Sequence, residues 1–100
     1  MREPTPYAER VLATVRKIPR GTVMTYGDVA EYMGEGGARA VGGIMRHFGN
    51  EVCWHRVVMS DGQPSPSCTD LAISLLVDDD TPMSVDGRRV DLRRARWDGR

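Results

Sequence analysis

A chain of 100 residues, 40% of them hydrophobic, can build one hydrophobic core and is too short for two independent ones. We therefore expect a single small domain over residues 1–100. No apolar run approaches the ~18 residues that a membrane-spanning helix needs, and no signal-peptide pattern opens the chain. The two cysteines have neither the spacing of a disulfide framework nor that of a metal site. The expected location is therefore a reducing cytoplasm, with no membrane contact, metal or cofactor.

The charges are unevenly distributed although the formal net charge is zero. The acidic run Asp78–Asp80 precedes a C-terminal stretch that is rich in arginine. The arginines of this stretch are Arg88, Arg89, Arg93, Arg94, Arg96 and Arg100. Because local patches of charge attract a polyanion, a neutral total does not exclude nucleic acid as a partner. If the tail arginines face DNA, they should add a salt-dependent contribution to binding; otherwise they face elsewhere, toward a protein partner.

A first helix is predicted from about Thr5 to Lys17. Thr5 is a favoured N-cap residue, and Pro6 suits the first helical position, where its missing N–H costs nothing. Apolar residues then recur at helical spacing on one face, which indicates that the helix is a strut of the core. These residues are Tyr7, Val11, Val15 and Ile18.

Two further helices are predicted on either side of a glycine-rich turn at residues 34–37. Thr25 begins the first of them, and Asp28 three residues later can complete a reciprocal capping pair. The second is expected from about Ala38 to Phe48 and to stop at Gly49. Two short helices joined by a tight turn form the helix-turn-helix pattern, which occurs in DNA-binding domains and also in ordinary helical hairpins.

One face of the helix predicted at residues 38–48 carries glycines bracketed by arginines. Arg39, Gly43 and Arg46 align at positions i, i+4 and i+7, and Gly42 lies next to them. Glycine costs about 1 kcal/mol inside a helix, so two in succession indicate a close approach, either of another helix or of a phosphate backbone. The flanking arginines favour a nucleic-acid surface. Tyr26, at the start of the preceding helix, could face the same substrate or close the edge of the core.

The apolar residues of the later elements predict how they pack. The buried stripe of the third helix is expected to be Ala38, Val41, Met45 and Phe48. A short buried strand is expected at Val57–Met59, and a turn or small hairpin around Asp86–Gly87. A last helix, capped by Thr69 or Asp70, is expected to bury Leu71, Ala72, Leu75 and Leu76. The residues alone favour a solvated helix end for Asp78–Asp80, and Trp97 is expected to pack back on the body.

The centre of the chain places an indole, an imidazole and a guanidinium in succession, at Trp54, His55 and Arg56. A nucleophilic cysteine needs a nearby base, usually a histidine oriented by a third group. Cys53 and His55 would share a face if the segment were extended, and an acidic residue of the 78–80 run could be the third group. A nucleophilic role for Cys53 is therefore one hypothesis for this stretch.

Several parts of the sequence together resemble the DNA-binding domain of O6-alkylguanine-DNA alkyltransferases. They are Tyr26, Ala38–Arg46, Trp54–Val58 and Val90–Trp97. In those enzymes a Pro-Cys-His-Arg-Val motif carries the alkyl-accepting cysteine. Aligning the His-Arg-Val-Val of this chain on that motif puts Trp54 at the cysteine position and Cys53 at the proline position. This pattern resembles the alkyltransferase-like proteins, which have tryptophan there and are not alkyltransferases.

The resemblance implies a mainly α, single small domain with a winged-helix-like helix-turn-helix, as in the alkyltransferase C-terminal domain, plus a short strand or hairpin. It implies that Arg39 enters the duplex and fills the gap left by an extruded base, and that Tyr26 crowds the phosphate of the rotating nucleotide. Gly42, Gly43 and Arg46 would complete the DNA-binding surface.

The lesion pocket implied by the resemblance is centred on Trp54, with His55 and Arg56 beside it. The related enzymes orient their histidine with a glutamate, for which Asp79 is the nearest match here. No residue is expected to be catalytic, because the alkyl-accepting position holds an indole.

The expected function is therefore that of a non-enzymatic damage sensor. A monomer would bind double-stranded DNA containing O6-alkylguanine, flip the lesion into the pocket and flag it for nucleotide-excision repair proteins. Two alternatives remain open from the residues. One is an O6-alkylguanine-DNA alkyltransferase that uses Cys53, and the other is a winged-helix transcription regulator that prefers a base sequence over a lesion.

Overall fold

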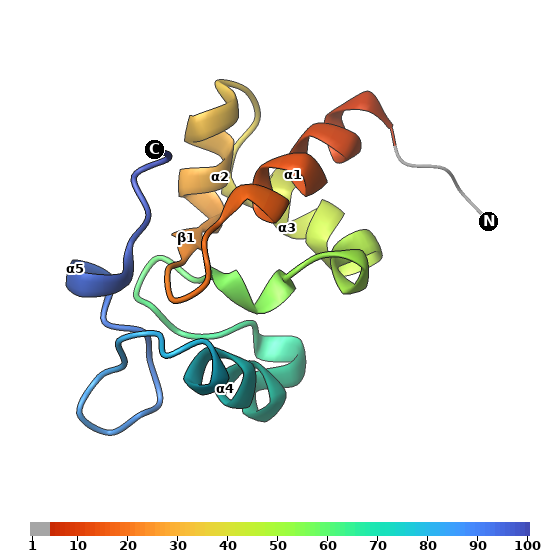
Figure 1. Ribbon diagram of the computed structural model, residues 1–100. Helices are drawn as coiled ribbons and strands as arrows, with labels where there is room; N and C mark the ends of the chain where they lie inside the picture. Colours follow the sequence, from red (N-terminus) through yellow and green to blue (C-terminus); the bar gives the residue numbers. More distant parts are fainter. Residues whose placement is uncertain (1–4) are drawn as a thin grey trace.

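The computed structural model describes residues 5–100 and is mainly helical, which confirms the predicted fold class (Figure 1). The helices are α1 Pro6–Lys17, α2 Tyr26–Met33, α3 Ala38–Phe48, α4 Thr69–Asp78 and α5 Leu92–Ala95. The strands are β1 Met24–Thr25 and β2 Val57–Val58, and the short 3-10 helices are η1 Gly49–Glu51, η2 Trp54–Arg56 and η3 Pro66–Cys68. None of the helices within residues 5–100 is long and apolar enough to cross a membrane.

Local capping determines where the first two helices begin. The Thr5 hydroxyl accepts a hydrogen bond from the Ala8 N–H (3.1 Å) at the start of α1. At α2, the Thr25 hydroxyl accepts from the Asp28 N–H (3.0 Å) and the Asp28 carboxylate accepts from the Thr25 N–H (3.1 Å). The predicted capping pair is thus confirmed, and it satisfies two backbone donors that a helix start leaves unpaired. Gly34 ends α2 with a φ of 75°, a conformation that glycine adopts without strain.

The strands β1 and β2 form a short parallel pair between two apolar clusters. Met24 pairs with Val57, and Thr25 pairs with Val58. Because successive side chains of a strand point to opposite faces, Val57 enters one cluster and Val58 enters the other. The first cluster holds α1, α2 and α3 together and contains Val11, Val15, Ile18, Met24, Val29, Ala30, Val41 and Val57. The second joins α4 and the C-terminal segment to the strands and contains Val23, Val58, Leu76, Val90 and Ala95.

The C-terminal segment is attached alongside β1 and α2 (Figure 1). The Trp97 N–H donates to the Val23 carbonyl (2.8 Å), and the Trp97 ring stacks on Tyr32 with 5.9 Å between ring centres. The prediction that Trp97 packs back on the body is confirmed. The turn or small hairpin expected around Asp86–Gly87 is confirmed: the Gly87 N–H donates to the Ser84 carbonyl (2.9 Å), and Met83 and Val90 form one antiparallel bridge.

Two of the expected apolar stripes are only partly buried. Val41 is buried in α3, but Ala38 is exposed because the helix starts directly after the exposed glycine turn. In α4, Ala72 is buried while Leu71 is 54% exposed. One step along a helix rotates a side chain by about 100°, which carries Leu71 away from the buried face.

Candidate nucleic-acid interface

The 3-10 helix η2 presents Trp54 near the surface between the end of α3 and strand β2. The Trp54 side chain is half-buried, and its ring meets His55 edge-on, with 6.3 Å between ring centres and an angle of 89°. Its Cβ lies beside Gly49, at which an added Cβ would come within 3.5 Å of it. Trp54 is not among the residues packed against either apolar cluster. The indole is therefore available at the candidate site.

The thiol of Cys53 points away from this surface. Its Sγ donates a hydrogen bond to the Val15 carbonyl of α1 (3.3 Å), and the residue packs against the first apolar cluster. Cys53 and His55 would share one face only in an extended segment, and residues 54–56 form a 3-10 helix, so that condition is not met. The polar ring nitrogen Nε2 of His55 contacts Asp79.

Asp79, the residue that caps the C-terminus of α4, fixes the position of η2. Its Oδ2 lies 2.8 Å from His55 Nε2 and accepts a hydrogen bond from Arg56 Nε, also at 2.8 Å. Its Oδ1 accepts from Arg56 Nη2 at 3.2 Å. The remaining Arg56 nitrogen, Nη1, donates to the Ile18 carbonyl at the end of α1 (3.0 Å). One carboxylate and one guanidinium thus tie η2 to the ends of two helices that are distant in the sequence.

The hydrogen bonds from the Arg56 guanidinium lower the pKa of Asp79 below its ordinary value of 3.8. Burial of the carboxylate acts in the opposite direction, and the contact with His55 adds to the lowering. The same pair raises the pKa of Arg56. Asp79 is therefore ionised at neutral pH and remains paired with a cation.

The solvated helix end expected from the residues alone is wrong for Asp79, whose side chain is only 11% exposed. It is correct for Asp78 and Asp80, which are exposed. The helix ends at Asp79, and that ending turns the carboxylate back toward η2. Three identical residues in succession carry no local signal that distinguishes them, and only the resemblance pointed to Asp79 as the partner of His55.

The glycine face of α3 is open. A Cβ added at Gly42 or at Gly43 would meet no other atom within 4 Å. Close packing of another helix on this face, the alternative left by the sequence, is therefore excluded within residues 5–100. Arg39 and Arg46 are exposed, and neither forms an ion pair with a described residue.

The first turn of α3 adds to the positive character of this face. Its N-cap is Gly37, which provides no side-chain hydrogen bond, and the turn contains no acidic residue. The backbone N–H groups at the helix start are therefore without a side-chain acceptor, beside Arg39. This combination can accommodate the phosphates of a nucleic-acid backbone.

Tyr26 is the first residue of α2, directly after the Thr25 cap, and is half-buried against the first apolar cluster. It is thus part of the core edge, and its contact with DNA stays a prediction. Two cavities of the described part of the chain are lined by residues other than Trp54, His55 and Arg56. The lesion pocket predicted at these three residues also stays a prediction; the polar groups of His55 and Arg56 hold the segment in place.

Comparison with known proteins agrees with the family resemblance of the sequence. Residues 6–76 match the family described as 6-O-methylguanine DNA methyltransferase, DNA binding domain. The chain is 38% identical over 96 residues to a DNA base-flipping protein of Escherichia coli (strain K12), covering 91% of this chain and 74% of that protein. It is 46% identical over 56 residues to alkyltransferase-like protein 1 of Schizosaccharomyces pombe, covering 53% of this chain and 52% of that protein.

Solved structures show the same similarity over nearly the whole chain. The crystal structure of S. pombe Atl1 in complex with damaged DNA containing O6-carboxymethylguanine matches with a TM-score of 0.80 and 31% identity. The match covers 97% of this chain and 98% of that one. The O6-methylguanine methyltransferase of Mycobacterium tuberculosis matches with a TM-score of 0.67 and 27% identity, covering 84% of this chain and 55% of the enzyme.

Replacing Asp79 with asparagine removes the charge that Arg56 contacts. We expect Asp79→Asn to lower the free energy of unfolding by about 1.5–3 kcal/mol at neutral pH, the usual contribution of a hydrogen bond to a charged group. Because the pKa of Asp79 is lower in the folded state than its ordinary value, the stabilisation by this carboxylate is fully present above pH 3.8. It is lost as the pH falls through the folded-state pKa. Urea unfolding at a series of pH values should show that the difference in free energy of unfolding between the wild type and Asp79→Asn becomes smaller below about pH 4.

Asp80→Asn is the matched control for this measurement. Asp80 is exposed, and its φ of 60° suits asparagine, so the substitution should change the free energy of unfolding by less than about 0.5 kcal/mol. Equal losses in the two variants would contradict the anchoring role of Asp79.

The open space at Gly43 predicts opposite effects on stability and on DNA binding. Gly43→Ala should raise the free energy of unfolding by about 0.5–1 kcal/mol, because alanine is the better helix former. If a DNA backbone packs on this face, the same variant should bind duplex DNA more weakly in a fluorescence-anisotropy titration. Ser74→Ala, on the exposed side of α4, is the control that should leave DNA affinity unchanged. Unchanged affinity of Gly43→Ala would remove the glycine face of α3 from the interface.

Proposed function

We propose that this chain, which belongs to the family of the 6-O-methylguanine DNA methyltransferase DNA-binding domain, is a non-enzymatic sensor of O6-alkylguanine in double-stranded DNA. The observation that carries the proposal is the half-buried Trp54 on η2, the residue that the sequence resemblance puts at the alkyl-accepting position. An indole has no thiolate with which to attack an alkyl carbon. The complex with the lesion would therefore persist without repairing it.

Two contributions to the binding free energy favour the damaged base over an intact one: a smaller cost of extrusion and a gain from stacking. Extruding a nucleotide from the duplex costs a few kcal/mol, and the cost is smallest for a base that already pairs badly. Stacking of the extruded base on an aromatic ring returns about 1–3 kcal/mol. Trp54 supplies that ring, and Asp79 holds it in place through His55 and Arg56. Selectivity thus begins with the weak pairing of the lesion and is completed by the fixed indole.

The exposed face of α3 would hold the duplex during this step. Arg39, at the start of the helix, would enter the gap left by the extruded base. Gly42 and Gly43 would let the backbone approach, and Arg46 would contact a phosphate. Tyr26, which precedes this face in the helix-turn-helix, would crowd the phosphate of the rotating nucleotide. Two proteins that are similar to this chain support the assignment. One is named a DNA base-flipping protein, and the structure of the other is a complex with damaged DNA containing O6-carboxymethylguanine.

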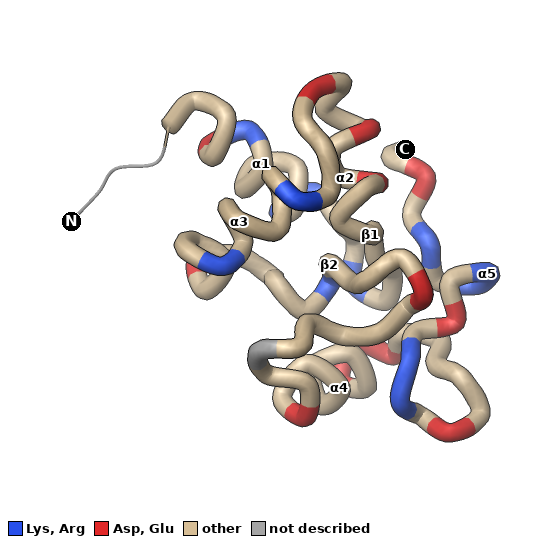
Figure 2. The backbone as a smooth tube through the Cα atoms, turned by 180° about the vertical axis from the view of Figure 1, so that it is seen from behind, with Lys and Arg blue, Asp and Glu red and all other residues tan. Residues whose placement is uncertain are grey.

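The persistent complex would act as a marker for other proteins. We propose that the protein works as a monomer in the cytoplasm and passes the lesion to nucleotide-excision repair proteins, as the family resemblance implies. The tail arginines Arg93 and Arg94 are exposed on α5. In both views of the backbone α5 lies on the other side of α2 from α3 (Figures 1 and 2). This arrangement supports a contact of the tail with a protein partner.

Incubation with duplex DNA carrying a labelled O6-methyl group separates the sensor from an alkyltransferase that uses Cys53. We expect the label to remain on the DNA, because the Cys53 thiol is hydrogen-bonded to α1 and an indole occupies the aligned position. Cys53→Ser should leave lesion binding unchanged. Transfer of label to the wild-type protein, and its loss in Cys53→Ser, would identify a repair enzyme.

Arg39→Ala tests the role of the inserted side chain. The variant should lose more affinity for lesion-bearing than for intact DNA of the same sequence, because it loses the group that fills the gap as well as a phosphate contact. Arg46→Ala is the matched control, expected to weaken both duplexes equally and to reduce the salt dependence of binding. Equal losses for Arg39→Ala on the two duplexes would contradict insertion. A preference for one base sequence over a lesion would instead indicate a winged-helix regulator.

A further inference from the structure

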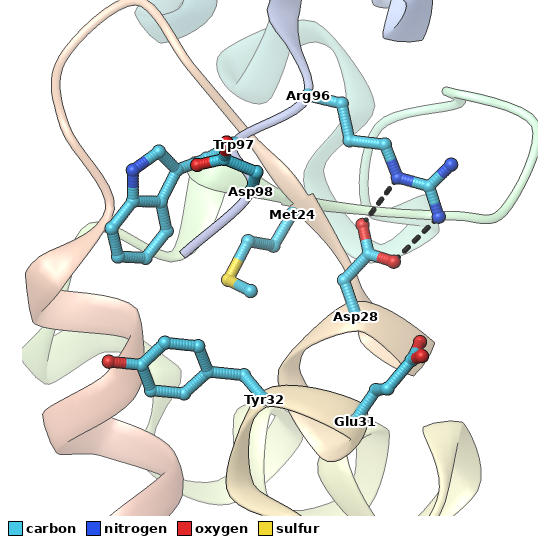
Figure 3. Close-up of a pocket in the computed structure, with 7 residues that line it drawn as sticks. All are labelled: Met24, Asp28, Glu31, Tyr32, Arg96, Trp97 and Asp98. Carbon is cyan, nitrogen blue, oxygen red and sulfur yellow. Dashed lines mark hydrogen bonds and ion pairs between the residues drawn. The ribbon is translucent and has the colours of Figure 1, made fainter. Parts of the chain in front are cut away.

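A cavity of about 410 Å³ lies where the C-terminal segment crosses α2, apart from the glycine face of α3 (Figure 3). It is lined by Met24, Asp28, Glu31, Tyr32, Arg96, Trp97 and Asp98. Its volume is in the range of pockets that hold a small ligand or a large side chain. None of these residues takes part in the proposed recognition of DNA.

The lining combines an apolar floor, an aromatic wall and an acidic rim. Met24, which is 3% exposed, forms the floor, and the stacked rings of Tyr32 and Trp97 form the wall. Figure 3 shows these side chains on one side of the cavity and the carboxylate of Glu31 on the other. Glu31 and Asp98 are exposed and form no ion pair with a described residue. The Asp98 Oδ1 accepts a hydrogen bond from the Arg100 N–H (3.1 Å), and its Oδ2 makes no hydrogen bond to a described residue. The cavity therefore offers two carboxylates without an ion pair beside aromatic surface.

Cations of the chain itself already occupy positions around this wall. The Arg96 guanidinium binds the Asp28 carboxylate through Nε (2.9 Å) and Nη2 (2.6 Å). The Lys17 ammonium lies 5.6 Å from the centre of the Tyr32 ring, within the distance of a cation–π contact. The edges of the cavity thus already contain one charge-assisted pair, Arg96 with Asp28, and one cation–π contact, Lys17 with Tyr32.

The charge of the lining opposes a nucleic-acid ligand. Three carboxylates and one guanidinium give it a formal charge of −2, which repels phosphate. The α3 face has the opposite character, because Arg39 and Arg46 form no ion pair with a described residue. The charge of the lining therefore favours a cationic ligand.

We propose that this cavity binds an arginine side chain of a protein partner. The aliphatic stem would lie on Met24 and Trp97, and the guanidinium would reach the carboxylates of Glu31 and Asp98. Arginine fits better than lysine because its planar group stacks on an indole and pairs with carboxylates at the same time. A neutral chain would thereby carry two surfaces, one for DNA and one for a basic protein segment.

NMR titration of the ¹⁵N-labelled full chain with the peptide acetyl-Gly-Arg-Gly-amide tests the proposal in the absence of DNA. Saturable shifts are expected at Glu31, Tyr32, Asp98 and the indole N–H of Trp97. The citrulline counterpart has nearly the same shape without the charge, and it should bind at least about tenfold more weakly. Because no DNA is present, the result does not depend on whether the protein senses O6-alkylguanine.

The double variant Glu31→Gln/Asp98→Asn should lose at least about tenfold in affinity for the arginine peptide. Glu9→Gln, an exposed position on α1, should bind like the wild type. Glu31→Gln alone serves if the double variant does not fold, because the Glu31 side chain makes no hydrogen bond to a described residue. The proposal is wrong if the wild type shows no saturable shift, if citrulline binds equally, if the variants bind undiminished, or if duplex DNA shifts the same resonances.

Discussion

The Asp79 carboxylate and the Arg56 guanidinium meet in a two-point contact where the ends of α1 and α4 converge on η2. Arg56 also donates to the Ile18 carbonyl, and His55 shares the same carboxylate. A partly buried charge pair contributes less to stability than its short distances indicate, because both charges are removed from water. Its larger effect is to specify one arrangement, since either charge without the other would be left unpaired.

That arrangement decides which side chain of the central stretch faces the candidate site. With η2 coiled and held from both sides, the Cys53 thiol turns toward Val15 of α1 and the indole of Trp54 remains at the surface. An acceptor for an alkyl group and a surface on which a base can stack are different functions. In the function that we propose, the choice between them depends on the path of residues 53–56, which the contacts of Asp79 with His55 and Arg56 hold.

The distribution of ion pairs explains how a chain with zero net charge can bind a polyanion. Arg10, Arg20 and Arg96 pair with carboxylates of the described residues, so their charges are largely compensated. Arg39 and Arg46 on α3 are not compensated, and the open glycines between them add no bulk. Two carboxylates without an ion pair, those of Glu31 and Asp98, lie instead beside the C-terminal segment. The separation of signs creates two surfaces of opposite character from a balanced composition.

The caps of α1 and α2 and the bounds of α3 were readable from the sequence because their causes are local. The cap predicted for α4 at Thr69 or Asp70 was wrong, because α4 follows η3 directly and its N-cap is Cys68. The Thr25 and Asp28 pair spans three residues, and the bounds of α3 follow from glycines at either end. The resemblance added the family and the position of Trp54, which no periodicity contains. The contacts that position the site join residues far apart in the chain: His55 and Asp79 are 24 residues apart, and Asp28 and Arg96 are 68 apart. Which of three successive aspartates turns inward, and where the Cys53 thiol points, were decided only by tertiary packing, because those outcomes depend on which helix ends meet in space.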